Sequence, residues 1–173
     1  MTDECKPIDP TAFGLFFVAL VSLPLALAGF LNFAGVDNAI MAHAPELLML
    51  GGIFIAIAAW KAYSAGSNFG FIVFGLVALG VFYAGCDGGD LYISITLGII
   101  YLICLVWSVR AKTLKTLTFI LLTTALVFFA NGFVVDSAGA DWSWLFLGIA
   151  AILNFALNLY LAFALADEHI PCY

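Results

Sequence analysis

The chain has 173 residues, of which 65% are hydrophobic, 16% aromatic and only 9% charged, with a formal net charge of −6. Soluble domains carry about 25% charged and about 45–50% apolar residues, so this composition excludes a water-soluble globular protein, a disordered chain and a nucleic-acid-binding protein. The class that remains is an all-α, polytopic membrane protein.

The few charged residues divide the chain into long apolar stretches. Five stretches contain 19 to 27 consecutive uncharged residues, and a helix needs about 20 apolar residues to cross the hydrocarbon core. A sixth stretch, between Glu46 and Lys61, is shorter, but Lys61 can extend to the membrane interface beside Trp60. We therefore predict one transmembrane domain over residues 1–173, with six helices at about 11–34, 45–64, 68–86, 91–109, 116–135 and 142–166.

Helix starts are marked by residues that can cap them. Asp9 and Pro10 give the first helix an N-cap acceptor followed by proline at its first position. Pro45 opens the second helix in the same way, Ser67 or Asn68 can cap the third, and Asp141 can cap the sixth. Pro24 lies inside the first span and should kink it. The segment before that span holds three acids and one Lys, the wrong sign for a secretory signal peptide.

Neutral polar residues, rather than ionisable ones, lie deep in the spans. They are Ser22, Asn32, Ser94, Thr96, Thr123, Thr124, Asn131, Asn154 and Asn158. Asn154 and Asn158 are four residues apart and share one face of the sixth helix. These residues could be packing contacts between helices or could line a pore for a small polar solute, and the pattern leaves both open.

The spans contain no set of residues typical of catalysis. No nucleophile–base pair, paired carboxylates or phosphate-binding loop occurs at membrane depth, and the cysteines and histidines lack the spacing of a metal site. We therefore expect no enzymatic activity, no cofactor and no metal.

The basic residues predict the orientation. Six spans place both termini on one side of the membrane, and that side holds every Lys and Arg: Lys6, Lys61, Arg110, Lys112 and Lys115. The other side holds only acids: Asp37, Glu46, Asp87, Asp90, Asp136 and Asp141. The positive-inside rule predicts cytoplasmic termini for a multi-pass protein of the inner or plasma membrane. The acidic outer face argues mildly against capture of anions from outside.

Segments in three regions, in order between residues 9 and 168, resemble the motifs of a known family. They are Asp9-Pro10-Thr11-Ala12-Phe13-Gly14-Leu15; Gly51-Gly52-Ile53 with Gly66-Ser67-Asn68-Phe69-Gly70; and Tyr160-Leu161-Ala162 with Asp167-Glu168. They resemble the N-P-x-P-[LF]-G-L, G-G-I … G-N-T-F-G and Y-L-A … N-E motifs of the acetate uptake transporters. That family contains bacterial succinate–acetate permeases and yeast ammonia/acetate exporters.

The resemblance implies a homo-hexamer in the lipid bilayer, with a pore in each protomer. It implies passage of small monocarboxylates, chiefly acetate, and sometimes of succinate or ammonium. The family's apolar constriction falls at Val18, Val77 and about Thr124, beside Phe17, and none of the three positions keeps the family's Phe, Tyr or Leu. Asp9 replaces the family's signature Asn and adds a negative charge at the inner mouth.

Together these patterns predict a narrow pore lined by Asp9, Gly14, Phe17, Val18, Asn68, Val77, Thr124, Asn131, Asn154 and Asn158. Without an ionisable relay inside the spans, a passive anion channel or facilitated pathway is favoured over proton symport. One alternative is a channel for a neutral solute such as urea, a short amide or ammonia. Another is a non-transporting membrane assembly subunit, in which the asparagines only pack. We expect no nucleic-acid partner.

Overall fold

The computed structural model describes residues 10–36, 40–87, 89–167 and 170–171. In this part of the chain the structure is all-helical, as predicted. The helices are α1 (Pro10–Phe33), α2 (Ile40–Ser64), α3 (Asn68–Asp87), α4 (Leu91–Arg110), α5 (Lys115–Asp136) and α6 (Asp141–Ala166). All six are long and apolar enough to cross a membrane. The prediction of six membrane-spanning helices is confirmed.

The start of α2 differs from the prediction. The helix begins at Ile40, one turn before Pro45, and Pro45 lies inside it. A proline near a helix start removes only one backbone hydrogen bond, so the residues before it can continue the helix. Pro24 likewise lies within α1, which continues as a helix to Phe33.

Two of the predicted caps had different outcomes. The Ser67 hydroxyl accepts a hydrogen bond from the Gly70 amide at 3.2 Å and so caps α3. Asp141 is not a cap, because the N-cap position of α6 is occupied by Ala140 and Asp141 is the first helical residue. Its carboxylate still lies in the first turn, where the helix dipole favours a negative charge.

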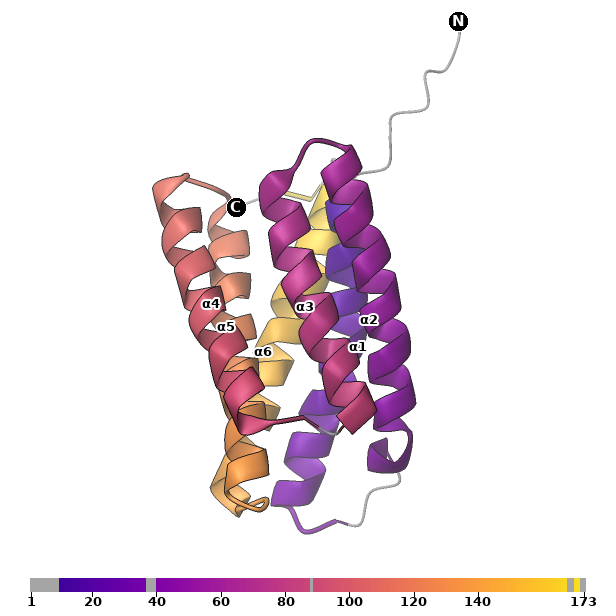
Figure 1. The fold of residues 1–173 in the computed structure, drawn as a ribbon, viewed down its shortest axis with the longest axis vertical. Coiled ribbons are helices and arrows are strands. Elements are labelled where there is room, and N and C mark those ends of the chain that lie inside the picture. The colour runs from indigo at the N-terminus through magenta and orange to yellow at the C-terminus, as the bar shows by residue number, and fades with distance from the viewer. Residues whose placement is uncertain (1–9, 37–39, 88, 168–169, 172–173) are drawn as a thin grey trace, which may run out of the picture.

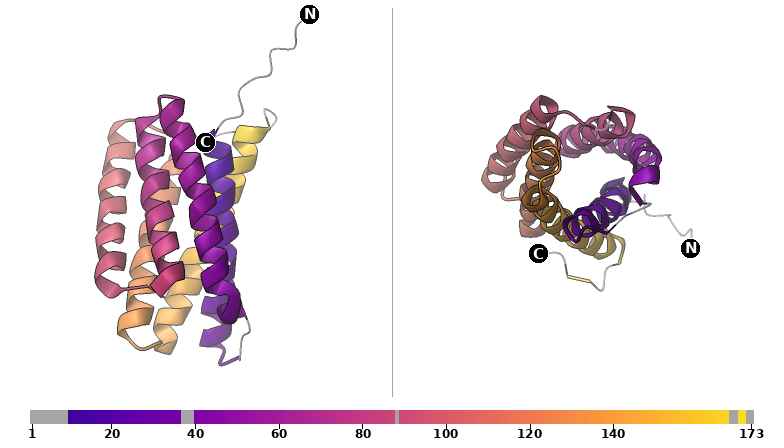
Figure 2. Two further views of the ribbon diagram at one scale, coloured as in Figure 1. Left: turned by 45° about the vertical axis from the view of Figure 1, so that its right-hand side comes forward. Right: turned by 90° about the horizontal axis from the view of Figure 1, so that it is seen from below.

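The helices are arranged in a ring when the molecule is viewed along its long axis (Figure 2). Helix α1 packs along α6 and α2, α3 packs along α2, and α5 packs along both α4 and α6, whereas α3 and α4 contact each other only slightly. One end of the bundle contains the start of α1, the end of α6, and the α2–α3 and α4–α5 connections (Figure 1). We call this the basic end, because Lys61, Arg110, Lys112 and Lys115 lie there, and the opposite end the acidic end.

Close contacts between helices depend on glycine. A Cβ atom at Gly29 of α1 would lie 2.4 Å from the backbone nitrogen of Gly148 in α6. In α3, a Cβ at Gly80 would collide with Phe128 and Leu97, whereas one at Gly85 would collide with Met49 and the Pro45 carbonyl. Gly80 and Gly85, five residues apart on α3, therefore let different neighbours approach that helix.

Large apolar side chains also cover the outside of the ring. Ile103 of α4 and Phe119 of α5 are each more than half exposed. In a membrane these side chains face lipid, so the outer and inner faces of each helix are similarly apolar.

Candidate functional site

Two cavities lie within the helical ring. The acidic-end cavity, of about 170 Å³, reaches Pro45 and Gly89 near the acidic end. The basic-end cavity, of about 100 Å³, reaches Thr11, Ser67 and Gly70 near the basic end. The two cavities therefore follow one another along the long axis of the bundle.

Three residues line both cavities: Val18 of α1, Val77 of α3 and Thr124 of α5. Residues that border two cavities lie between them, so we call these three the neck. Each neck side chain is only 4% exposed. Two valines and one threonine methyl make the neck mostly apolar, and the Thr124 hydroxyl is its one polar side-chain group.

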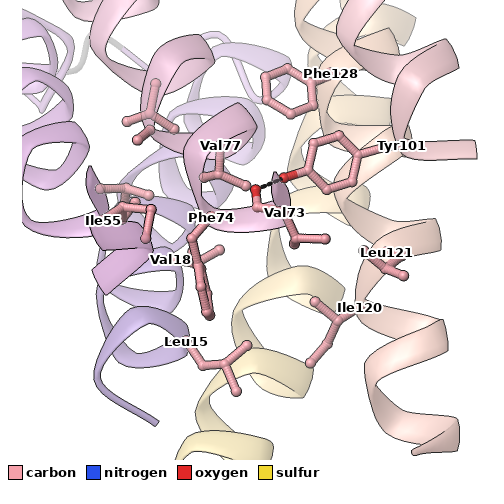
Figure 3. Packing of buried hydrophobic residues seen from close by; sticks show 14 of the residues in the cluster. Leu15, Val18, Ile55, Val73, Phe74, Val77, Tyr101, Ile120, Leu121 and Phe128 are labelled. Atoms are coloured by element: carbon pink, nitrogen blue, oxygen red, sulfur yellow. Dashed lines mark hydrogen bonds between the residues drawn. The ribbon is translucent and has the colours of Figure 1, made fainter. Parts of the chain in front are cut away.

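The cavity walls next to the neck are also apolar. On the basic-end side, Leu15 and Phe74 lie one turn from Val18 and Val77 on their helices (Figure 3). On the acidic-end side, Val21 and Val81 occupy the equivalent positions. A permeating solute would therefore lose most of its hydration at this level.

A buried polar network lies beside the neck. Thr124 Oγ1 donates to Asn154 Oδ1 at 3.1 Å, and Asn154 Nδ2 donates to Ser22 Oγ at 3.1 Å. The Ser22 hydroxyl donates in turn to the Val18 carbonyl at 2.7 Å. Thr123 also donates to Asn154 Oδ1, at 2.9 Å. The Asn154 side chain therefore connects α1, α5 and α6 at the level of the neck.

Asn158, one turn from Asn154 on α6, lines the basic-end cavity. Its Nδ2 donates to the Asn154 carbonyl at 2.8 Å and to Asn154 Oδ1 at 3.0 Å. Its Oδ1 is buried and has no hydrogen-bond partner within the described part of the chain. The wall of this cavity therefore contains an unused hydrogen-bond acceptor.

Each cavity also has polar groups on the side away from the neck, toward its own end of the bundle. In the acidic-end cavity, Asn131 Nδ2 donates to Ser94 Oγ at 3.3 Å and so joins α5 to α4. In the basic-end cavity, the Ser67 hydroxyl oxygen already accepts from Gly70. Its own proton remains able to donate to a solute.

Six of the predicted pore residues line the cavities: Val18, Val77, Thr124, Asn131, Asn154 and Asn158. Gly14, Phe17 and Asn68 are not among the lining residues. A Cβ at Gly14 would lie 2.6 Å from the Phe74 ring, the Phe17 ring stacks on Phe54 with centroids 4.6 Å apart, and Asn68 is exposed at the start of α3. Asp9 lies outside the described residues.

Tyr101 and Phe128 are among the aromatic lining residues that the sequence reasoning missed. Tyr101 of α4 lines the basic-end cavity and donates its hydroxyl to the Val73 carbonyl at 2.6 Å (Figure 3). Phe128 of α5 lines the acidic-end cavity, and its ring centroid is 5.6 Å from that of Tyr101. A tyrosine in mid-span signals a buried partner for its hydroxyl. No sequence signal separates Phe128 from a lipid-facing phenylalanine.

The described lining residues include no Asp, Glu, His, Lys or Arg. Across the described ranges, no three His, Cys, Asp or Glu residues come together in a group that could hold a metal ion. What the arrangement offers chemically is a desolvating neck between two cavities, with neutral hydrogen-bonding groups at and beside it.

No protein-family profile and no curated protein matches the sequence. One solved structure that resembles this chain is described as that of the bacterial acetate channel SatP. The two share 17% sequence identity with a TM-score of 0.77, over 97% of this chain and 100% of that chain. This likeness shows that the chain has the fold of that channel.

Proposed function

We propose that this chain is a non-enzymatic membrane channel for small solutes, and that small monocarboxylates, chiefly acetate, pass through it. The observation that supports the proposal is the neck, since Val18, Val77 and Thr124 border both cavities and the two cavities therefore meet at these residues. The fold shared with an acetate channel supports the same function.

The chemistry of the path suits a small carboxylate. Its charged group can find donors near the mouths, at Ser67 and at the Asn131–Ser94 pair, and its methyl group can contact the valines of the neck. A narrow apolar neck also excludes large and strongly hydrated solutes. The described lining residues offer no carboxylate, imidazole or amine as a proton relay, which favours passive permeation over proton-coupled transport.

The proposed setting is a homo-hexamer in the inner or plasma membrane, with the basic end in the cytoplasm. An apolar groove between α2 and α3 on the outside of the ring supports assembly. Small residues of both helices, including Gly52, Ala56 and Gly75, line it, and a Cβ at Gly75 would meet nothing within 4 Å. Stripes of small residues allow close packing between membrane helices.

Blocking the neck tests the function. In liposomes containing the purified protein, labelled acetate should enter faster than in protein-free liposomes, and Val77→Trp should reduce the rate to the protein-free level. The indole is much larger than the buried valine that it replaces. Ile72→Trp is the matched control, because Ile72 lies on the same helix, is exposed, and lines neither cavity.

The control variant should conduct like the wild type. Unchanged acetate flux in a correctly assembled Val77→Trp protein would show that acetate does not pass through the neck. Absence of acetate flux in the wild type would favour the assembly-subunit alternative, and labelled urea in place of acetate would distinguish a channel for neutral solutes.

A further inference from the structure

The orientation of the Asn158 side chain is determined by its neighbours. The Asn154 backbone carbonyl can only accept a hydrogen bond, so the Asn158 atom that lies 2.8 Å from it is the nitrogen. The second N–H of the same group is used by Asn154 Oδ1 at 3.0 Å. This leaves Asn158 Oδ1 as the end of the amide without a hydrogen bond, in a residue that lines the basic-end cavity.

Neither Tyr101 nor Thr124, two other polar residues of this cavity, donates a hydrogen bond to Asn158 Oδ1. The Tyr101 hydroxyl gives its proton to the Val73 carbonyl, and the Thr124 hydroxyl gives its proton to Asn154 Oδ1. Both lie in the cavity wall with Asn158. Most of the wall around them is apolar: Leu15, Phe69, Val73, Phe74, Val77, Leu117 and Ile120.

We infer that the basic-end cavity binds an uncharged solute that carries an N–H or O–H donor next to a small apolar group. The donor would bond to Asn158 Oδ1, and the apolar group would contact Val18 and Val77. Short primary amides have this chemistry, and acetamide has the shape of acetate with an NH₂ group in place of one oxygen. This inference rests on the proposed function, because it assigns a second class of permeant to the same path.

A carboxylate anion cannot use this site in the same way. Its oxygens are acceptors and carry the negative charge, so they gain nothing from another acceptor such as Asn158 Oδ1. Acetate and acetamide should therefore respond differently to loss of this one side chain, although they are nearly equal in size.

The test measures labelled acetamide and labelled acetate, separately, in liposomes with wild-type protein, Asn158→Leu or Asn32→Leu. Asn32 is the matched control, because its Nδ2 donates to the carbonyl four residues earlier at 2.8 Å, as Asn158 does, but it lines neither cavity. Asn158→Leu should lower the ratio of protein-dependent acetamide flux to protein-dependent acetate flux about tenfold, the factor expected for one lost hydrogen bond. Asn32→Leu should change neither flux.

The outcomes separate this inference from the proposed function. If acetate crosses and acetamide stays at the protein-free rate, the inference is wrong and the proposed function stands. If neither solute crosses in the wild type, both fail. An equal loss of both fluxes in Asn158→Leu would show that Asn158 only holds the helix in place, which also overturns the inference.

A competition assay on the wild type covers the case in which Asn158→Leu does not assemble. Acetone has nearly the shape of acetamide but no donor. Acetamide should slow labelled acetate flux, and acetone at the same concentration should not. Equal effects of the two solutes would contradict recognition by Asn158 Oδ1.

Discussion

Asn154 connects three helices through one side chain. Its Oδ1 accepts from Thr123 and Thr124 of α5, and its Nδ2 donates to Ser22 of α1. A buried amide is costly in an apolar bundle unless it is fully paired, so this network restricts how α1, α5 and α6 can pack. The restriction matters because the neck residues Val18 and Thr124 belong to the same network.

Asn154→Leu should lower the free energy of unfolding by about 2 kcal/mol, because the variant leaves several buried groups without partners. Asn32→Leu should cost less than about 1 kcal/mol, since it removes one half-buried bond within its own helix. Denaturant titration of the two proteins in detergent micelles compares them. Equal losses would mean that the network around Asn154 adds nothing to stability.

At the scale of the helices, small residues determine where α1 lies against α6. The positions of Gly29 and Gly148 bring the two backbones into direct contact. By contrast, Gly75 of α3 faces open space on the outside of the ring. Gly29 therefore has a packing role within the protomer, whereas Gly75 has none.

Gly29→Ala should destabilise the protein by about 1–3 kcal/mol, because its Cβ would lie 2.4 Å from the Gly148 nitrogen and force the helices apart. Gly75→Ala should be neutral or stabilising by up to about 1 kcal/mol, because alanine is the better helix former. Thermal unfolding of both variants in detergent checks this. A Gly29→Ala protein as stable as the wild type would show that α1 and α6 are not held at this distance.

At the scale of the whole molecule, the ring encloses two cavities, and its charged residues lie at its two ends. Basic residues gather at one end and acidic residues at the other, and the described cavity walls between them carry no Asp, Glu, His, Lys or Arg. A solute that crosses as an anion must therefore do so without a partner charge and without exchanging a proton with the wall.

Acetate currents through the reconstituted protein should reverse at the acetate Nernst potential, because a passive path adds no driving force of its own. Electrical recording under an acetate gradient, at equal pH on both sides, measures the reversal potential. Electroneutral uptake that disappears when the proton gradient is removed would argue instead for coupled transport.

The local patterns of the sequence were sufficient to predict the number and the limits of the helices. The spacing of charges predicted five of the six spans, because membrane insertion depends on apolar length, a property that each segment has by itself. The second span was predicted from the interfacial residues Trp60 and Lys61 at its end. The predicted helix starts were wrong at two positions. Helix α2 begins before Pro45 and continues through it, and α6 begins at Asp141 with Ala140 as its N-cap.

Only the tertiary structure decided which side of each helix faces the cavities. In a membrane protein the lipid-facing and inward-facing sides are equally apolar, so no periodicity separates Phe128 from Phe119, or the buried Ser94 from the exposed Thr96. The neck positions Val18, Val77 and Thr124 came from a family resemblance, whereas Gly14 and Phe17 turned out to pack against neighbouring helices. The sequence by itself determined that the chain crosses the membrane six times, and packing determined which residues meet inside.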